Sequence, residues 1–361
     1  MEKKKYAVIQ VIDQLHAGGA ERVLVGWANI LSEKGHSSAV LTTVSPGILR
    51  KDIHQEVSFF NLNRQWKWNP FAMYRMIQIL KKYDIIHVHS SHNLRYVWLA
   101  AKLFRLHKPL FFHEHFYFEK ISWHRRIIYP KTMMICVSKF VRDWAIQNQL
   151  STEKKAFLLP NIILPQKIDI ISNTARKTNS IIQIVTTGNI APRKNYEFIL
   201  EVFKELKKQL FENFHLTIIG SVADKKYFHY IQNKILLDGL EKQVEFIHDC
   251  ANIQPILHQF DIALHASKFE TGPLVLIEYL AKKIPFLTFQ TGQVSEQIKN
   301  ELPEFVLEHY DPILWVSAIQ KIISADKKLL HKRMESVFEK NFSVDQYYAK
   351  GMHIYSQGFP E

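Results

Sequence analysis

Two carboxylates separated by a glycine-proline turn carry the strongest chemical signal in the sequence. Glu270 falls in a loop, and Glu278 lies eight residues later in the helical segment 274–281, which is otherwise apolar. A carboxylate among apolar side chains is costly unless it meets hydrogen-bond donors. Sugar hydroxyls supply such donors, and the alternative is a salt bridge to a neighbouring lysine.

Two adjacent cations follow another strand-like segment. The apolar run 182–187 leads into Gly188 and Asn189, and Arg193 and Lys194 come just before a helical segment. Glycine frees the turn, and two cations beside the free N–H groups of a helix N-terminus suit a diphosphate. The alternative is a solvated basic loop.

A glycine pair follows the first strand-like segment. Gly18 and Gly19 precede a helical pattern, so the backbone can approach a ligand closely and the helix N-terminus can offer N–H groups to an anion. The spacing is not the dinucleotide-binding fingerprint G-x-G-x-x-G. The alternative is an ordinary tight turn.

Three ionisable residues, His113, Glu114 and His115, end the segment 110–112. A His-x-His pair can bind a metal, but no third ligand with clear spacing is evident, so we predict no metal site. We expect a histidine that faces a ligand, and the alternative is a triplet on the surface.

These residues need a scaffold that brings the ends of strands together. Short strand-like runs alternate with helical patterns, which predicts parallel sheets covered by helices on both faces. The predicted strands are 7–12, 38–43, 57–62, 85–89, 110–113, 134–137, 182–187, 216–219, 244–247, 262–264 and 286–288. The predicted helices are 21–34, 70–81, 94–104, 196–210, 226–237, 253–260, 274–281 and 312–323. Ligands of such sheets bind beyond the carboxyl ends of the strands, where the residues above lie.

The alternation pauses once, which indicates two domains. Residues 1–165 and 181–340 each predict a Rossmann-like α/β domain, and the polar stretch 166–180 predicts a linker. The amphipathic tail within 341–361 predicts a last helix that packs back on the first domain.

The composition of the chain limits the classes of protein to which it can belong. The chain has 361 residues, 47% of them apolar, a net charge of +13 and only two cysteines. Two isolated cysteines exclude a zinc ribbon or a disulfide scaffold and fit a reducing, cytoplasmic compartment. No window approaches the roughly 18 apolar residues that span a bilayer. The positive charge favours acidic partners, namely nucleic acid, anionic lipid or a phosphorylated substrate.

In their order and spacing, these pieces together resemble glycosyltransferase family 4, whose two-Rossmann architecture is called GT-B. The resemblance covers essentially the whole chain and implies two domains that face a central cleft. It is carried by the following residues: Gly18 to Arg22, His115, Val137-Ser138, Pro160-Asn161, Gly188, Arg193 to Asn195, Glu270, Glu278 and Gly292 to Glu296.

The resemblance also implies roles for single residues. Lys194 is similar to the lysine that binds the donor diphosphate, Glu270 to the carboxylate near the donor sugar and Glu278 to the one that holds the ribose. His115 resembles a histidine beside the transferred sugar, and with Arg193, Lys194 and Glu270 it forms the expected catalytic set. The expected donor-binding residues are Gly188, Asn189, Gly272, Pro273, Leu274 and Glu278, and the acceptor or phosphate side would contain Gly18 and Gly19.

Three positions depart from the family pattern. Asn189 stands where arginine is frequent, Ile162 where a glycine usually follows Asn161, and Thr291 where a second glycine is common. We expect Arg193 to compensate for the missing arginine at the diphosphate.

The predicted reaction is a retaining transfer of a hexose-type sugar from a nucleotide diphosphate sugar, UDP-linked, to an envelope polysaccharide, a lipopolysaccharide or a lipid-linked acceptor. Family members generally need no metal, because basic side chains neutralise the leaving diphosphate, so no cofactor is expected. The alternatives are an epimerase or phosphorylase on the same fold, or a basic module that binds anions or nucleic acid. Glu270 and Glu278 would repel a nucleic-acid phosphate, so we expect no nucleic acid.

Two segments interleave aromatic side chains with cations. Residues 64–75 contain Trp66, Trp68, Phe71 and Tyr74, and residues 116–131 contain a second such group. Tryptophan and tyrosine suit the headgroup zone of a membrane, so we expect the first domain to touch an anionic surface on the cytoplasmic side. The alternative is that these aromatic side chains are buried.

Overall fold

The computed structural model describes residues 4–164, 181–209, 213–248, 250 and 252–359. The chain forms two compact units. One unit runs to Ile163 and includes the segment from Ser343 onward, and the other spans Leu164–Phe342. We call them unit 1 and unit 2. The linker expected at 166–180 lies outside the described residues.

Unit 1 contains a seven-stranded parallel sheet with the strand order β3-β2-β1-β4-β5-β6-β7. The strands are β1 Ala7–Ile12, β2 Ser37–Thr42, β3 Ser58–Asn61, β4 Ile85–Val88, β5 Leu110–Glu114, β6 Met133–Cys136 and β7 Ala156–Leu158. The strand order reverses between β1 and β4, so their carboxyl ends mark the switch point where such sheets hold ligands.

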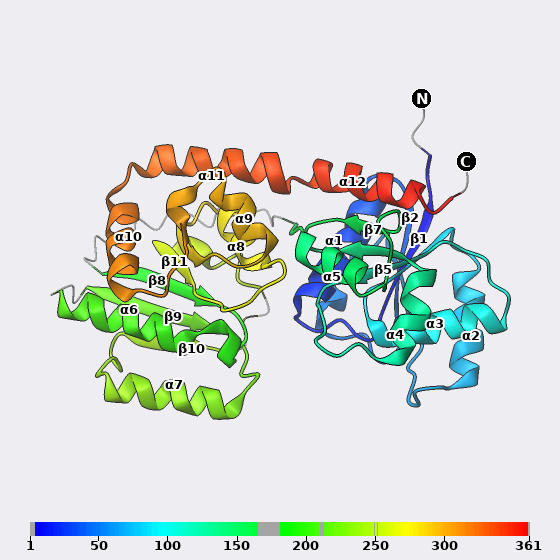
Figure 1. The fold of residues 1–361 in the computed structure, drawn as a ribbon, viewed down its shortest axis with the longest axis horizontal. Coiled ribbons are helices and arrows are strands. Elements are labelled where there is room, and N and C mark those ends of the chain that lie inside the picture. The colour runs from blue at the N-terminus through cyan, green and yellow to red at the C-terminus, as the bar shows by residue number, and fades with distance from the viewer. Residues whose placement is uncertain (1–3, 165–180, 210–212, 249, 251, 360–361) are drawn as a thin grey trace. The chain divides into compact units, whose positions relative to one another are not determined.

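Among the described residues of unit 1, six α-helices accompany this sheet (Figure 1). They are α1 Gly19–Glu33, α2 Pro70–Leu80, α3 Ser91–Leu103, α4 Trp123–Ile128, α5 Lys139–Gln147 and α12 Val344–Ser356. Side-chain caps fix where α3 and α5 begin, because Ser90 and Ser138 accept hydrogen bonds from the N–H groups of Asn93 and Val141. The core is a continuous apolar cluster between the sheet and α2, α3 and α5.

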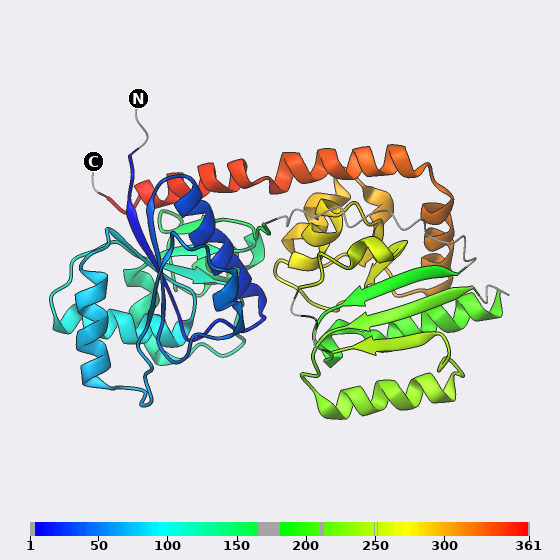
Figure 2. The ribbon, with the colours of Figure 1, turned by 180° about the vertical axis from the view of Figure 1, so that it is seen from behind.

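The last helix packs on α1, although it follows unit 2 in the sequence (Figure 2). Gly351 permits this approach, because a Cβ atom there would lie 2.6 Å from the Trp27 ring. The Trp27 indole donates a hydrogen bond of 2.7 Å to the Tyr355 hydroxyl. The ion pair of Lys34 with Asp345 adds a contact at the solvent edge.

Unit 2 contains a six-stranded parallel sheet with the order β10-β9-β8-β11-β12-β13. Its strands are β8 Ile182–Thr187, β9 Phe214–Ile219, β10 Val244–Ile247, β11 Ile262–His265, β12 Phe286–Phe289 and β13 Val306–Leu307. Its helices are α6 Tyr196–Lys208, α7 Lys225–Leu237, α8 Leu274–Ala281, α9 Gly292–Lys299, α10 Pro312–Ser324 and α11 Lys327–Phe342.

The predicted fold class of two Rossmann-like α/β halves is confirmed. The helix predicted at 253–260 is wrong, because only the short 3₁₀ turn Leu257–Gln259 forms there. Ile253, Leu257 and Phe260 are buried at helical spacing, but Pro255 disfavours the α conformation at Gln254, so a helix could begin no earlier than the proline itself. Among the described residues, no helix has the length and apolar character to cross a membrane.

Candidate functional site

The turn after β8 is shaped by close contact with Lys194. Gly188 has φ +146°, and a Cβ atom at this position would lie 2.9 Å from Cε of Lys194. The lysine side chain therefore crosses the bare glycine backbone. The Tyr196 hydroxyl donates a hydrogen bond of 2.6 Å to the Gly188 carbonyl, which holds the turn against the start of α6.

Lys194 and Arg193 both pair with Glu270, which lies in the loop after β11. The Lys194 Nζ atom is 2.5 Å from Oε1 of Glu270, and an Arg193 guanidinium nitrogen is 3.5 Å from Oε2. The side chains of Lys194 and Glu270 are each 11% exposed, whereas that of Arg193 is 50% exposed. A buried ion pair thus lies at the strand ends, with a second cation on its solvent side.

His265, at the end of β11, completes this group and was not predicted from the sequence. Its Nε2 atom is 3.8 Å from Oε1 of Glu270, and its ring nitrogens contact the hydroxyls of Thr288 and Ser267. Burial, reinforced by the charge of Lys194, lowers the pKa of His265 to about 3, so the ring is neutral. Its place at a strand end was the available signal.

Glu270 is an ionised carboxylate at neutral pH. Burial acts to raise its pKa, but Lys194, His265 and Arg193 together outweigh burial and hold the pKa below its usual value. The three positive or polar partners therefore stabilise the charged form. An anion with geometry similar to the carboxylate would find the same partners.

The loop that carries Glu270 is tied to the start of α9. The Glu270 N–H donates to the Thr291 hydroxyl at 2.9 Å, and the Gln293 N–H donates to the Thr271 carbonyl at 3.1 Å. Gly292 has φ +75°, and a Cβ atom there would lie 2.7 Å from the Glu270 carbonyl oxygen. Thr291, a departure from the family pattern, thus supplies a hydroxyl that fixes the loop.

Glu278 lies on α8 and is 5% exposed. Lys282, one turn further on, has a pKa that burial lowers and that Glu278 acts to raise, so the two side chains interact. Pro273 occupies the N-cap of α8 without a side-chain hydrogen bond, Leu274 begins the helix and Gly272 precedes both. Asn189 contacts the Ser221 hydroxyl at 3.1 Å, beyond the neighbouring strand.

The glycine pair of unit 1 begins α1 as expected. Gly18 is the N-cap and Gly19 the first helical residue. The Glu21 carboxylate folds back so closely that a Cβ atom at Gly18 would collide with it. Burial raises the pKa of Glu21, with smaller opposing effects from its own backbone N–H and from His16. The N-terminus of α1 therefore already has a carboxylate of the chain itself beside it.

The triplet His113, Glu114 and His115 is buried, so the alternative of a surface triplet is wrong. His115 follows β5 directly, and its Nε2 atom lies 3.3 Å from Nδ1 of His89. Burial lowers the pKa of His115 to about 3. His87 in β4 and His89 just after it stand beside the triplet, so the fold supplies the further histidines that sequence spacing did not indicate.

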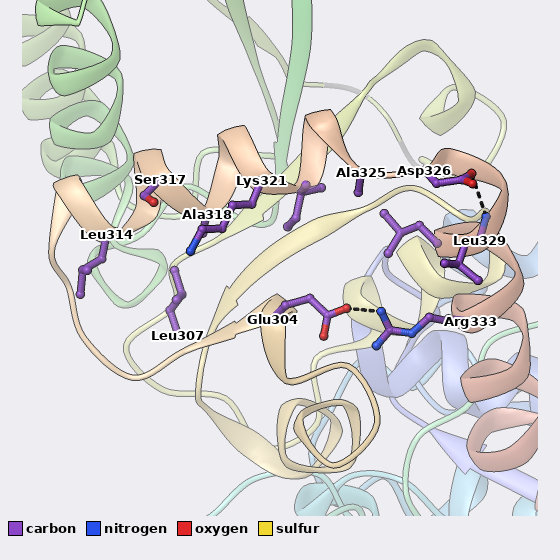
Figure 3. A pocket seen from close by; sticks show the side chains of 12 residues that line it. Glu304, Leu307, Leu314, Ser317, Ala318, Lys321, Ala325, Asp326, Leu329 and Arg333 are labelled. Carbon is purple, nitrogen blue, oxygen red and sulfur yellow. Dashed lines mark hydrogen bonds and ion pairs between the residues drawn. The ribbon is translucent and has the colours of Figure 1, made fainter.

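The structure thus brings Gly188, Arg193, Lys194 and Glu270 together within unit 2, while His115, Gly18 and Gly19 belong to unit 1. A separate apolar cavity of about 370 Å³ lies in unit 2 between α10 and α11 (Figure 3). An ion pair of Glu304 with Arg333 stands at its wall. None of the predicted site residues lines this cavity.

Two parallel Rossmann-like sheets and basic residues placed for an anion at the strand ends define the GT-B class of glycosyltransferases. The family model "Glycosyltransferase Family 4" matches residues 17–167, and the model "Glycosyl transferases group 1" matches residues 168–337. The chain belongs to the family 4 type of glycosyltransferases.

Curated relatives and solved structures agree with this assignment. The capsular polysaccharide biosynthesis glycosyltransferase CapH of Staphylococcus aureus is 23% identical over 358 residues, which cover 94% of this chain and 96% of CapH. The amylovoran biosynthesis glycosyltransferase AmsD of Erwinia amylovora is 23% identical over 89% of this chain and 91% of its own. The structure of Anabaena HepE with UDP-glucose has a TM-score of 0.79 at 16% identity, covering 97% of this chain and 100% of HepE.

Proposed function

We propose that the chain is a retaining glycosyltransferase that moves a hexose-type sugar from a UDP-linked donor to an envelope polysaccharide, a lipopolysaccharide or a lipid-linked acceptor. The observation that carries the proposal is the buried pair of Lys194 with Glu270, with Arg193 beside it. A donor diphosphate needs two cations at this place, and a sugar needs a carboxylate next to them.

The carboxylate of Glu270 occupies the position in which it neutralises both cations. When a diphosphate binds, its oxygens would replace Glu270 as partners of Lys194 and Arg193. Glu270 would then accept hydrogen bonds from the sugar hydroxyls instead. The two cations and the carboxylate would therefore each keep a partner while the donor binds.

Catalysis would rest on charge stabilisation. As the bond from the sugar to the diphosphate breaks, negative charge grows on the leaving oxygen, and fixed cations there stabilise the transition state. Lys194 lies closely against the Gly188 backbone, which restricts its side chain while its partner changes from Glu270 to the diphosphate. Retention follows when the acceptor attacks from the face that the diphosphate leaves, with a diphosphate oxygen as proton acceptor. Two cations on the diphosphate are the reason that we propose no metal for this step.

Other residues complete the proposed donor and acceptor sites. Glu278 would bind the ribose hydroxyls, and the N-terminus of α8 would assist at the phosphates. His115 would hydrogen-bond the sugar as a neutral imidazole, and the Gly18-Gly19 turn would lie on the acceptor or phosphate side. His115 is 6% exposed, so only its edge at the strand end could reach a ligand.

The relatives support these substrate classes. HepE was solved with UDP-glucose, and the Escherichia coli relative, 23% identical over 72% of this chain, is a UDP-Gal galactosyltransferase that acts on a GlcNAc-diphosphoundecaprenol. A Campylobacter jejuni relative, 23% identical over 92% of this chain, transfers N-acetylgalactosamine to a PP-undecaprenol glycan. Lipid-linked acceptors suggest work at the cytoplasmic face of a membrane.

Exposed aromatic side chains on unit 1 fit such a surface. Trp66, Phe71 and Trp123 are 71%, 81% and 73% exposed, so the alternative that these side chains are buried is wrong for them. Arg95 lies over the Trp68 ring and Arg125 over the Phe118 ring, so a cation accompanies an aromatic ring in each segment. Aromatic side chains among cations suit an anionic bilayer surface.

Not every residue of these segments is available to a membrane. The Arg64 side chain is only 8% exposed and lies over the Tyr96 ring, and Tyr129 is buried in the core. The cations that do face solvent are Lys67, Arg75, Lys120, Arg126 and Lys131. A peripheral contact through unit 1 would therefore use the aromatic tips and these five cations.

One experiment tests the transferase proposal against its alternatives. Nucleotide sugars are screened by thermal shift, since a selective ligand stabilises the fold by mass action. The stabilising sugar is then incubated with and without envelope glycan or lipid-linked acceptors. A transferase releases nucleoside diphosphate only with an acceptor. Turnover without acceptor would favour an epimerase, and release of sugar phosphate from the glycan in a parallel incubation with inorganic phosphate would favour a phosphorylase.

A further inference from the structure

Four imidazole rings pack against one another inside unit 1. His87 and His89 come from β4 and its end, and His113 and His115 come from β5 and its end. The rings of His87 and His113 are stacked with centroids 5.3 Å apart, and those of His113 and His115 are stacked at 4.3 Å. The alternation of a strand puts all four on one face of the sheet.

Ring nitrogens of two members have no hydrogen-bond partner, although they are buried. This holds for both nitrogens of His113 and for Nε2 of His87. Leaving a buried polar atom without a partner costs free energy, so such atoms call for an explanation. Burial, and then the neighbouring histidines, hold the pKa values of His87, His89 and His113 well below the usual value. The rings are therefore neutral, and neutral imidazole is the form that binds metals.

We propose that His87, His89 and His113 bind a first-row divalent metal ion of the Zn²⁺ type, in a site separate from the donor-binding residues. One nitrogen of each ring lies within 4.8 Å of the others. Tetrahedral ligation at about 2.0 to 2.1 Å separates nitrogens by about 3.4 Å, so the rings need to close by about an ångström. The fourth ligand would be water.

The outer nitrogens of the ligands have oxygen neighbours, as metal-binding histidines do. Nε2 of His89 lies 2.8 Å from the Gln10 amide oxygen, and Nδ1 of His87 lies 2.7 Å from the Tyr355 hydroxyl. The Tyr355 hydroxyl already accepts hydrogen bonds from the Trp27 indole and the Gln10 amide, so in the metal-free chain it donates to Nδ1 of His87. Metal binding therefore requires His87 to carry its proton on Nδ1 instead, and it requires Nδ1 of His89 to exchange its contact with His115 for the metal.

Such an ion would be structural. It would join β4 to β5 directly, and through Gln10 and Tyr355 it would join β1 and the last helix to the same point. Its expected effect is on the stability of unit 1, so the prediction does not depend on the proposed transfer reaction. His87 and His89, which the sequence spacing of the triplet did not indicate, supply the further ligands of this proposal.

The test uses the full chain without a histidine tag, stripped with a chelator. Co²⁺ is titrated as a spectroscopic probe, Zn²⁺ is then used to displace it, and bound metal is counted after dialysis. We expect one ion per chain, visible absorption typical of tetrahedral Co²⁺, and a melting temperature raised by about 5 to 10 °C at a hundredfold excess over Kd. His113→Phe is expected to lose about a hundredfold or more of the affinity.

His113→Phe keeps the ring stack and removes the two unpartnered nitrogens, so without metal it is expected to melt at or above the wild-type temperature. Tyr355→Phe, which removes only the outer hydroxyl, should weaken binding about tenfold. His229→Ala, on the exposed face of α7, is the matched control and should bind normally. No binding to the wild-type chain at micromolar metal, or equal binding to the wild type and His113→Phe, would overturn the proposal.

Discussion

Replacement of Lys194 by alanine is the most informative perturbation of the proposed donor site. The lysine is buried, 2.5 Å from Glu270, and crosses Gly188. Its removal has two separate effects. It deletes a cation that the leaving diphosphate would use, and it leaves the Glu270 carboxylate buried with weaker compensation.

The structure gives the size of each effect. Breaking a buried ion pair costs about 3 to 5 kcal/mol when nothing else compensates the remaining charge. Arg193 remains 3.5 Å from Glu270, so we expect about 2 to 3 kcal/mol of lost unfolding free energy in unit 2. For the reaction, loss of a charge-stabilising donor costs about 2.7 to 4 kcal/mol, which is a fall of roughly 10²- to 10³-fold in kcat.

A double variant separates the two effects. In Lys194→Ala/Glu270→Gln the unpaired charge is gone, so unfolding free energy should return to within about 1 kcal/mol of wild type. Turnover should not return. The assays are urea unfolding and acceptor-dependent release of nucleoside diphosphate. Lys204→Ala is the matched control, because its side chain is 51% exposed and Asp238 keeps Lys234 as a partner, so unfolding free energy and turnover should both stay close to wild type.

The reasoning fails if folded Lys194→Ala retains near-normal turnover. It also fails if the double variant recovers activity together with stability. The first result would remove Lys194 from the reaction, and the second would show that the single variant was inactive only because unit 2 was destabilised.

Further predictions follow from other contacts. Glu278→Gln should weaken donor nucleotide binding about 10- to 100-fold in calorimetry while acceptor affinity stays constant, and unchanged nucleotide affinity would favour a salt-bridge role instead. The pKa of Glu270 in the folded chain lies below the unfolded value of 4.5. The ionised Glu270 carboxylate therefore contributes fully to stability above pH 4.5, and this contribution is lost as the pH falls through the folded pKa. Glu270→Gln should therefore flatten the acid limb of a stability profile, and an identical profile would contradict the assignment. Gly188→Ala combines a contact of 2.9 Å with φ +146°, so it should lower stability by about 1 to 3 kcal/mol and raise KM for the donor; a neutral effect on both would refute the tight turn. The double variant Trp66→Ala/Phe71→Ala should reduce co-sedimentation with anionic liposomes at low salt, and a wild-type chain that binds no such liposomes would remove the membrane contact.

The functional residues at the strand ends could be predicted from the sequence, because they lie next to or within a clear pattern of apolar residues. The run before Gly188 and the apolar helix around Glu278 have lengths and periods that leave few alternatives. The pairing of Lys194 with Glu270 was not predictable, since 76 residues separate them and only the order of β8 and β11 in the sheet brings them together. The sequence predicted separate roles for these two side chains, which form one ion pair in the structure.

The four histidines of unit 1 were not predicted as one cluster for the same reason, because the two pairs are distant in the sequence and meet only in the sheet. Each His-x-His pair is inconspicuous alone, and the parallel register of β4 with β5, which pairs His87 with Phe111, puts the two pairs on one face. At 253–260 the error has another origin. Buried residues spaced like those of a helix also suit a 3₁₀ turn, and Pro255 shortens the segment that could be helical by excluding the α conformation from the residue before it.

The place of α12 also sets an order of events during synthesis. Tyr355 contacts Trp27, which the ribosome joins to the chain 328 residues earlier. At about 5 to 20 residues per second, roughly 15 to 65 seconds pass between the two. Unit 2, from Leu164 to Phe342, is continuous and can close within that interval. The first unit to be made is thus the last to be completed, and until then the Trp27 face of α1 is open to chaperones or to other nascent chains.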